Sequence, residues 1–270
     1  MQIDLGGRVA IVTGAGRGIG RVIAETLAGE GVKTVVTDVN PAALEDVRAA
    51  FAQHGWAGKQ LLCDVRDLAR IEEVVAEVTR DYGRLDILVN NAGVLRSGSV
   101  EQLSEADWDL STDVNLKGVF LMSKAVIPIM KKQRSGRIIN AASFATIIPS
   151  TNSASYAAAK AGVHYFTRVL AGELGPWNIT VNCYAPGMVP TEMNHFAEQP
   201  AESRSRLLDT LTLRRWGKEA EVANLICFLA SDLAGYITGT MVDVSGGKFA
   251  TQIPRAAYEA AANEGEYSFE

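Results

Sequence analysis

The stretch Thr13-Gly14-Ala15-Gly16-Arg17-Gly18-Ile19-Gly20 decides the fold of this chain. It follows a short apolar run, Arg8 to Thr13, and leads into a helical pattern from about Gly18. Glycine lets the backbone approach a ligand closely, and the N-terminus of a helix offers unpaired N–H groups to an anion. The stretch predicts a strand, a turn and a helix that bind a pyrophosphate, although an ordinary tight turn remains an alternative. The residues placed in that role are Gly14, Gly18 and Gly20, with Ile19 between the last two.

Short apolar runs and longer helical stretches alternate along the rest of the chain. The remaining predicted strands span 33–38, 60–64, 86–90, 136–142, 179–184 and 240–244. Helical periodicity begins at about residues 18 and 41, runs through 71–78, and covers 113–132, 153–175 and 220–230. This order favours a parallel sheet, and runs that are apolar on successive residues are typical of strands covered on both faces. The sequence therefore predicts an α/β fold, a single doubly wound Rossmann-like domain whose mostly parallel seven-stranded sheet is flanked by helices.

That domain is predicted to span residues 1–250. Within it, residues 188–217 are polar and weakly patterned, and a long irregular segment of this kind is typical of a substrate lid. Residues 251–270 form a C-terminal tail for which two alternatives stay open, disorder or packing on a neighbouring subunit near its substrate cleft. The aromatic residues that favour packing are Tyr258, Tyr267 and Phe269.

Composition narrows the classes of partner. Of 270 residues, 47% are hydrophobic and 21% charged, and 26 Lys and Arg stand against 31 Asp and Glu, which gives a net charge of −5. The chain has no basic stripe for nucleic acid and no apolar run long enough for a membrane span, so neither partner is expected. Three scattered cysteines support neither a metal site nor a disulfide framework, and they are Cys63, Cys183 and Cys227. The first residues lack an export signal, which predicts a cytoplasmic protein.

Asp38 ends the second predicted strand, about 20 residues after the glycine turn. A carboxylate there can accept hydrogen bonds from the adenosine ribose, and it repels a 2′-phosphate, so NAD is expected over NADP. Arg17 argues for NADP because a guanidinium can pair with that phosphate, but it can also point to solvent. Asp64 and Val65, at the end of the third strand, are placed near the adenine, although capping of the next turn by Asp64 is an equal alternative.

Tyr156 and Lys160 lie four residues apart on a helical stretch and therefore on one face. A nearby ammonium favours the phenolate, so Tyr156 is a candidate general acid and base. Ser143 follows the strand 136–142 at the sheet edge where open parallel sheets bind ligands. A Tyr and a Lys at this spacing also occur as ordinary surface pairs, so the interpretation depends on this context.

Over residues 5–247 the chain resembles the short-chain dehydrogenase/reductase family. The matching motifs are Thr13-Gly14-x-x-x-Gly18-x-Gly20, Asn90-Asn91-Ala92-Gly93, Asn115, Ser143, Tyr156-x-x-x-Lys160, and Pro186-Gly187 with Thr191. The resemblance implies that Tyr156 is the general acid/base and that Lys160 lowers its pKa and holds the nicotinamide ribose. It implies further that Ser143 orients the substrate oxygen and that Asn115 anchors a water in a proton relay. Where the family often has Asn before Pro-Gly, this chain has Tyr184-Ala185, which leaves the cleft wall at Tyr184 open.

The resemblance also completes the expected cofactor site. Residues 91–93 are placed beside the nicotinamide ribose, and Val189 and Thr191 beside its carboxamide. The full set expected at NAD is Gly14, Arg17, Gly18, Ile19, Gly20, Asp38, Asp64, Val65, Asn91, Ala92, Gly93, Tyr156, Lys160, Pro186, Gly187, Val189 and Thr191.

The expected substrate wall mixes apolar and hydroxyl-bearing side chains, which favours a small secondary alcohol or ketone such as a sugar, sugar acid or polyol. Arg96 is a candidate for binding a substrate carboxylate, although pairing with the acidic segment 101–105 is an equal alternative. His195 in the lid is a further candidate contact. The substrate-binding set is Ser143, Ala145, Arg96, Asn152, Tyr156 and Met188.

Two other functions remain in view. An NADPH-dependent 3-oxoacyl-thioester reductase fits the same motifs, but Asp38 argues against its cofactor. A dinucleotide-sensing protein without turnover would not need Ser143, Tyr156 and Lys160. The helices at 113–132 and 153–175 carry apolar residues on more than one face, which predicts a homo-oligomer, and the family resemblance implies that it is a homotetramer.

Overall fold

The strands form one sheet. A computed structural model describes residues 3–194 and 196–269, and its sheet has the order β3-β2-β1-β4-β5-β6-β7 with parallel pairing between neighbours. This confirms the predicted fold, and the sheet is more uniformly parallel than expected. The strands are β1 (Val9–Thr13), β2 (Lys33–Asp38), β3 (Gly58–Leu62), β4 (Ile87–Asn90), β5 (Gly136–Ala141), β6 (Ile179–Pro186) and β7 (Met241–Val244).

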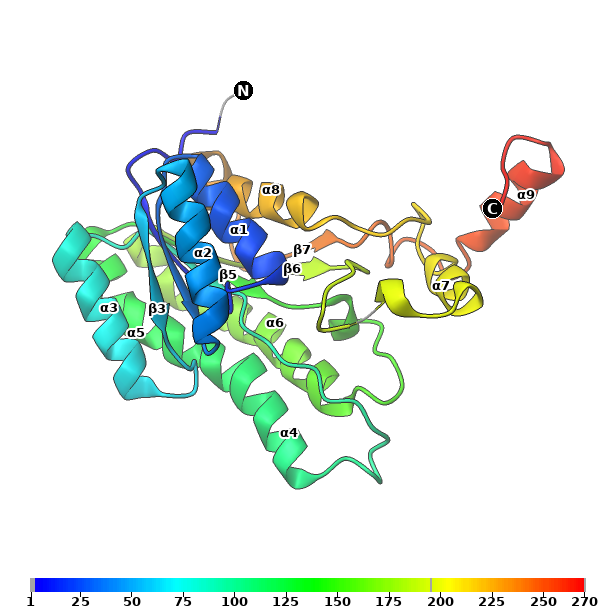
Figure 1. The fold of residues 1–270 in the computed structure, drawn as a ribbon, viewed down its shortest axis with the longest axis horizontal. Helices are drawn as coiled ribbons and strands as arrows, with labels where there is room; N and C mark the ends of the chain where they lie inside the picture. Colours follow the sequence, from blue (N-terminus) through cyan, green and yellow to red (C-terminus); the bar gives the residue numbers. More distant parts are fainter. Residues whose placement is uncertain (1–2, 195, 270) are drawn as a thin grey trace.

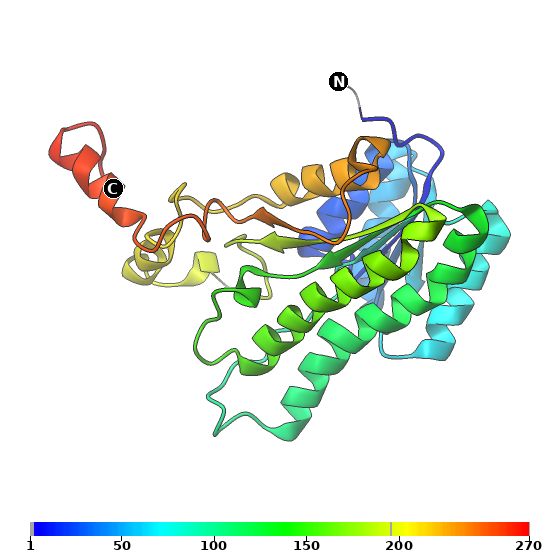
Figure 2. The ribbon, with the colours of Figure 1, turned by 180° about the vertical axis from the view of Figure 1, so that it is seen from behind.

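Helices cover both faces of this sheet (Figures 1 and 2). One layer holds α1 (Gly18–Gly29), α2 (Pro41–His54) and α8 (Glu219–Ala230). The other holds α3 (Leu68–Tyr82), α5 (Gly118–Gln133) and α6 (Ala154–Leu174). Strand β1 is buried on both faces. Ala10 and Val12 pack against the first helix layer, and Val9 and Ile11 pack against the second.

The helix expected at 113–132 has a more complex course. It begins as α4 (Glu105–Thr112), passes through a π-helical turn at Asp113–Lys117, and continues as α5. A π turn inserts one residue per turn and breaks the 3.6-residue period on which the sequence prediction relied. The short 3-10 segments are η2 (Phe144–Thr146), η3 (Gly175–Trp177), η4 (Phe196–Glu198) and η5 (Asp232–Ala234).

The lid and the tail project together from the carboxyl edge of the sheet, far from the N-terminal end of the chain (Figure 1). The lid contains α7 (Ala201–Leu208), and the tail contains α9 (Arg255–Asn263). The Tyr258 hydroxyl donates to the carbonyl of Thr212 at 2.5 Å. Part of the tail is thus helical and contacts the lid of its own chain, which differs from the expected disorder, while packing on a neighbouring subunit stays a prediction.

A second set of contacts joins the same two segments. Arg214 of the lid donates to the Tyr267 hydroxyl at 3.1 Å. The Phe269 ring lies between two guanidinium groups, 4.8 Å from that of Arg214 and 5.1 Å from that of Arg255. The Arg214–Phe269 contact joins the lid to the tail, and a cation–π contact of this kind adds about 0.5–1 kcal/mol at an exposed site, whereas the Arg255–Phe269 contact lies within the tail.

None of the helices among residues 3–194 and 196–269 has both the length and the apolar character needed to span a membrane. Within the same residues, no three His, Cys, Asp or Glu side chains gather as a metal site would require. The three cysteines are free and buried.

Candidate active site

The carboxyl ends of the central strands bring the predicted site residues to one edge of the sheet. The sheet order places β1 between β2 and β4, so successive connections leave β1 in opposite directions and open a crevice there. The glycine turn follows β1, residues 91–93 follow β4, and Ser143 follows β5. Pro186 closes β6 at the same edge.

The glycine turn is shaped by contacts that a side chain would destroy. Gly14 has φ +59°, and a Cβ there would lie 2.6 Å from the Cα of Ala92. At Gly20 a Cβ would lie 2.3 Å from Asn91 Nδ2. No side chain caps the N-terminus of α1, so the N–H groups of its first turn stay free to bind an anion. This arrangement fits the pyrophosphate of a dinucleotide.

A hydrogen-bond network fixes the loop after β4 against that turn. Asn91 Nδ2 donates to the carbonyls of Thr13 and Gly14 at 3.1 and 3.0 Å. Asn91 Oδ1 accepts a hydrogen bond from the Tyr184 hydroxyl at 3.1 Å. Tyr184 is fully buried, and its burial raises the pKa of its hydroxyl. Sequence reasoning missed this supporting residue and noticed only that Tyr184-Ala185 departs from the family pattern.

The Asp38 carboxylate lies beside the glycine turn. Its Oδ2 accepts from the backbone N–H of Gly16 at 2.9 Å, and its Oδ1 accepts from Asn40 N at 2.9 Å. A Cβ at Gly16 would lie 2.9 Å from the same carboxylate oxygen. Two backbone N–H groups therefore hold the Asp38 carboxylate in the position expected of a group that binds the ribose.

Arg17 is paired across the mouth of the crevice. Its guanidinium forms an ion pair with Glu192 at 2.5 Å, with side-chain exposures of 65% and 71%. Thr191 lies next to the glycine turn, since a Cβ at Gly18 would be 3.8 Å from Thr191 Cγ2. Asn194 holds the segment in place, because its Nδ2 donates to the carbonyl of Val189 at 2.8 Å.

Asp64 makes the contacts of a turn cap. Its Oδ1 accepts from the backbone N–H of Arg66 at 2.9 Å, and the Arg66 side chain pairs with the same carboxylate at 2.6 Å. Arg66 holds the pKa of Asp64 below its usual value. The adjacent Val65 is buried. These contacts match the capping alternative considered for Asp64.

Ser143, Tyr156 and Lys160 come together as their motif predicts. The Ser143 side chain lies near that of Tyr156 and lowers the pKa of its phenol. Lys160 is only 3% exposed, and its Nζ donates to the carbonyl of Ala141 at 2.7 Å. The same ammonium lies 5.7 Å from the centroid of the Tyr156 ring. The α6 helix thus places the phenol and the ammonium on the face toward the end of β5.

The two pKa shifts run in directions that follow from burial. Desolvation lowers the pKa of Lys160 from 10.5 to about 8. Desolvation also raises the pKa of Tyr156, and the nearby Ser143 side chain offsets only part of that rise. In the chain alone the expected lowering of the Tyr156 pKa is therefore absent, because burial of the phenol outweighs the contribution of Ser143.

Asn115 sits in the π turn and holds backbone on both sides of it. Its Nδ2 donates to the carbonyls of Val94 and Ser111 at 2.8 Å each. Its Oδ1 accepts from the N–H of Val94 at 3.2 Å. A Cβ at Gly93 would lie 2.9 Å from that oxygen. The turn thus directs Asn115 against the loop after β4, at a kind of helix irregularity that is frequent at functional sites.

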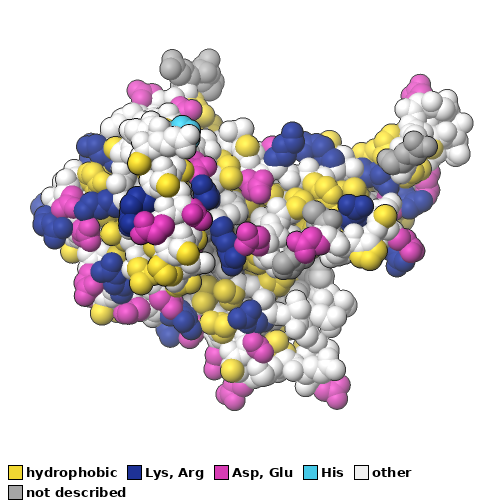
Figure 3. Space-filling model, viewed as in Figure 1, with side chains coloured by type: hydrophobic (Ala, Val, Ile, Leu, Met, Phe, Trp, Pro, Cys, Tyr) yellow, Lys and Arg dark blue, Asp and Glu magenta, His cyan; other side chains and the backbone are white. Residues whose placement is uncertain are grey.

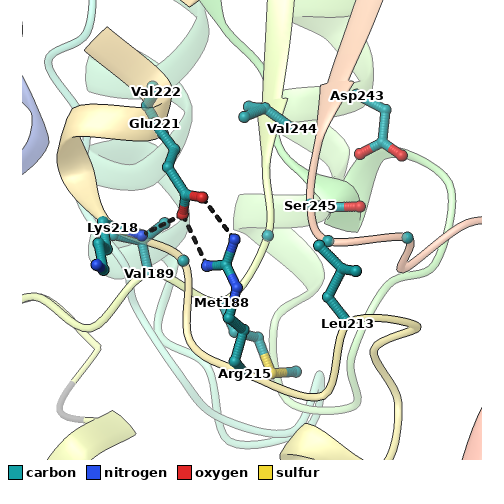
Figure 4. A pocket seen from close by; sticks show the side chains of 14 residues that line it. Met188, Val189, Leu213, Arg215, Lys218, Glu221, Val222, Asp243, Val244 and Ser245 are labelled. Carbon is teal, nitrogen blue, oxygen red and sulfur yellow. Dashed lines mark hydrogen bonds and ion pairs between the residues drawn. The ribbon is translucent and has the colours of Figure 1, made fainter. Parts of the chain in front are cut away.

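A cavity of about 210 Å³ lies where the lid meets the ends of β6 and β7 (Figure 4). Gly187, Met188 and Val189 form one side of it. At its mouth Arg215 pairs with Glu221 at 2.6 Å. Tyr156 and Lys160 are not part of its lining, so this cavity lies beside the catalytic candidates rather than at them.

The predicted substrate residues are more scattered. Ala145 is buried within the η2 turn, where its N–H donates to Ser143 Oγ at 3.2 Å. Asn152 has φ +63° and accepts a hydrogen bond from the N–H of Gly98 through its carbonyl. Arg96 pairs with Asp107 at 3.2 Å. His195 lies outside the described residues.

Comparisons with known proteins place this architecture in a family. Residues 14–248 match a family described as enoyl-(acyl carrier protein) reductase. The 3-oxoacyl-(acyl-carrier-protein) reductase of Thermotoga maritima is 41% identical over 244 residues, which cover 90% of this chain and 98% of that protein.

Two solved structures share the fold closely. A Sinorhizobium meliloti structure described as a short-chain alcohol dehydrogenase superposes with a TM-score of 0.88 at 38% identity, covering 92% of this chain and 99% of the other. A gluconate 5-dehydrogenase from Burkholderia cenocepacia, solved with NADP and tartrate, has a TM-score of 0.88 at 32% identity, covering 92% and 98%. The motifs, the topology and these similarities agree: this chain is an oxidoreductase that uses a nicotinamide dinucleotide, and it belongs to the short-chain dehydrogenase/reductase family.

Proposed function

We propose that this oxidoreductase transfers a hydride between NAD and a small secondary alcohol or ketone that carries further polar groups, as a sugar, sugar acid or polyol does. The observation that carries the preference for NAD is the Asp38 carboxylate, held 2.9 Å from Gly16 N beside the glycine turn. A 2′-phosphate about 4 Å away would be repelled by roughly 1–4 kcal/mol per charge pair.

The ion pair between Arg17 and Glu192 supports the same preference. The Glu192 carboxylate neutralises the Arg17 guanidinium, which otherwise would attract a 2′-phosphate. Because both side chains are mostly exposed, the pair contributes little energy, and Asp38 is expected to dominate the choice of cofactor.

The catalytic roles that we propose are those that the family resemblance implies, and the grouping of these residues at one edge of the sheet supports them. Ser143 holds the substrate oxygen, and Tyr156 accepts the hydroxyl proton in oxidation or returns it in reduction. A bound nicotinamide would supply the acceptor for the hydride that leaves the carbinol carbon. Lys160 stabilises the phenolate form of Tyr156 and binds ribose hydroxyls. Asn115 keeps the loop after β4 in place, with the relay water as its second proposed role.

The substrate class rests on the lining next to Ser143 and on one structural neighbour. Exposed Ile147 and Ile148 supply apolar surface. Residues 150–153 add short hydrogen-bonding side chains. The structural similarity to a gluconate 5-dehydrogenase supports a sugar acid.

Cofactor preference tests the proposal directly. We expect kcat/KM with NAD to exceed that with NADP by at least tenfold, and Asp38→Asn to narrow the ratio by about tenfold because it removes the repulsion. Asp46→Asn, on the exposed face of α2, is the matched control and should leave the ratio unchanged. Glu192→Gln should change it only a few-fold. A wild-type protein that prefers NADP would contradict the proposal.

An NADPH-dependent 3-oxoacyl-thioester reductase is the second candidate. The 41% identity to the Thermotoga maritima reductase favours it. Acetoacetyl-CoA and a set of sugar acids and polyols, assayed in parallel with both cofactors, separate the two functions. Turnover of any of these compounds removes a third possibility, a dinucleotide-sensing protein without catalysis.

A further inference from the structure

Lys248 lies where the loop after β5 meets the lid. Its Nζ donates to Thr210 Oγ1 at 2.6 Å and lies 5.4 Å from the centroid of the Phe144 ring. Phe144 follows Ser143 directly, and Thr210 belongs to the lid. The backbone N–H of Lys248 donates to Ser245 Oγ at 3.0 Å, which anchors the residue just past the end of β7. The ammonium is therefore positioned between the two predicted walls of the substrate cleft.

Lys248 differs from its cationic neighbours because no carboxylate balances it. Arg214 and Arg255 both pair with Asp209. Within residues 3–194 and 196–269, no ion pair joins Lys248 to an acidic side chain. The residue is half-buried, and desolvation alone lowers its pKa. A partly desolvated ammonium without a counter-ion favours an anionic partner.

Arg96, which the sequence suggested as the site for a substrate carboxylate, already has an acidic partner. Arg96 pairs with Asp107 at 3.2 Å. Figure 3 shows that Lys and Arg side chains are frequent on the surface of the lid and tail. Lys248, in contrast, contacts both Thr210 of the lid and Phe144, the residue next to Ser143.

We propose that Lys248 binds an anionic group of the substrate, a carboxylate or a phosphate, at the end remote from the reacting carbon. The inference rests on the proposed function, because it assumes that the substrate oxygen is held at Ser143. From that point the substrate extends along Phe144 toward the lid and brings its anionic end to the ammonium. The contact sets specificity for acids or phosphate esters over neutral alcohols of equal length.

Three six-carbon ligands that differ only at one end test this assignment. D-gluconate, D-glucitol 1-phosphate and D-glucitol, which differ at C1, are titrated by calorimetry into the protein saturated with NADH. We expect at least one anionic ligand to bind tenfold or more tightly than D-glucitol, a difference of about 1.4 kcal/mol. Whichever of the two anionic ligands binds with the lower Kd shows whether the site prefers a carboxylate or a phosphate. Lys248→Met should abolish the difference, and Lys248→Arg should retain most of it.

Lys131→Met is the matched control, because Lys131 also lies over an aromatic ring, 3.8 Å from that of Trp177, at the far end of α5. It should leave all three affinities unchanged. Equal losses for D-glucitol and the anions in Lys248→Met would assign Lys248 a structural role in the lid and overturn the proposal. A preference for anions that persists in Lys248→Met, or none in the wild type, would overturn it as well. If Lys248→Met does not fold, Lys248→Gln replaces it.

Turnover separates this inference from the proposed function. A charge preference that depends on Lys248, found together with no NAD-linked turnover of any alcohol, contradicts the function and leaves the anion site standing. NAD-linked turnover at equal efficiency for charged and neutral substrates supports the function and contradicts the role of Lys248.

Discussion

Lys160 and Tyr156 show how burial sets the chemistry of single side chains. Lys160 is nearly fully buried without an acidic partner, so its pKa falls to about 8, close to neutral pH. Tyr156 responds in the opposite direction, because burial penalises the phenolate. A residue pair chosen from sequence spacing alone therefore says which groups meet but not in which protonation state.

The lowered pKa of Lys160 predicts a pH-dependent stability. Between pH 8 and 10.5 the unfolded chain binds a proton that the folded chain has released, so the free energy of unfolding rises with pH. From pH 7.5 to 9.5 we expect the wild type to gain about 2 kcal/mol relative to Lys160→Met. Urea midpoints of both proteins at the two pH values measure the gain. Parallel pH profiles would show that the folded chain holds Lys160 protonated.

Tyr156→Phe should remove catalysis while leaving the cofactor bound. The substitution deletes only a hydroxyl, and general acid/base catalysis contributes roughly 10²- to 10⁴-fold. We expect kcat to fall by at least about 100-fold with the Kd of NAD nearly unchanged, as measured by steady-state kinetics and NAD titration. Tyr236→Phe, at a fully exposed position, is the control. A smaller loss of rate would mean that another group exchanges the proton.

At the scale of elements, the predicted strands and the long helices were recovered because their residues are buried in a periodic pattern. Two of the elements missed were α7 and α9, which are only eight and nine residues long and contain no buried residue. The helix α4 was missed for a related reason, since only Ser111 is buried in it. The glycine turn and the Tyr156 helix were predictable from local motifs, whereas Tyr184 acts on Asn91 across the sheet, a contact that no local pattern reveals.

Removal of residues 251–270 tests the coupling of tail and lid. The truncation deletes the contacts of Tyr258, Tyr267 and Phe269 with the lid, which should then open more often. We expect the KM for substrate to rise several-fold, trypsin cleavage within the lid to accelerate, and the Kd of NAD to stay unchanged. Tyr267→Phe, which removes only the hydrogen bond to Arg214, should show a smaller effect. Identical kinetics and cleavage in the truncated protein would mean that the tail does not restrain the lid.

At the scale of the whole molecule, α5 and α6 lie side by side on the outside of the fold, with no other described element in front of them in Figure 2. Phe120, Tyr165 and Val169 are 45%, 64% and 61% exposed. Apolar side chains grouped on adjacent helices are typical of an interface between subunits. We propose that this surface joins copies of the chain in a homotetramer.

Sedimentation at micromolar concentration should then show a tetramer. Val169→Asp places a charge in the apolar surface, and we expect it to shift the protein to smaller species. The control is Tyr236→Asp, at a position that is fully exposed and remote from these two helices in sequence. A wild type that sediments as a monomer would refute the proposed assembly.

In Figure 1 the described chain begins above α1 and α2 and ends in the tail, which projects away from the sheet beyond α7, and this decides how the protein should be attached to a solid support. Tethering through the end that precedes β1 leaves the carboxyl edge of the sheet facing the solution. Tethering through the end that follows α9 places the support against the tail and, through Arg214 and Tyr267, against the lid. An immobilised catalyst or a biosensor electrode built on this protein should therefore carry its linker at the N-terminus.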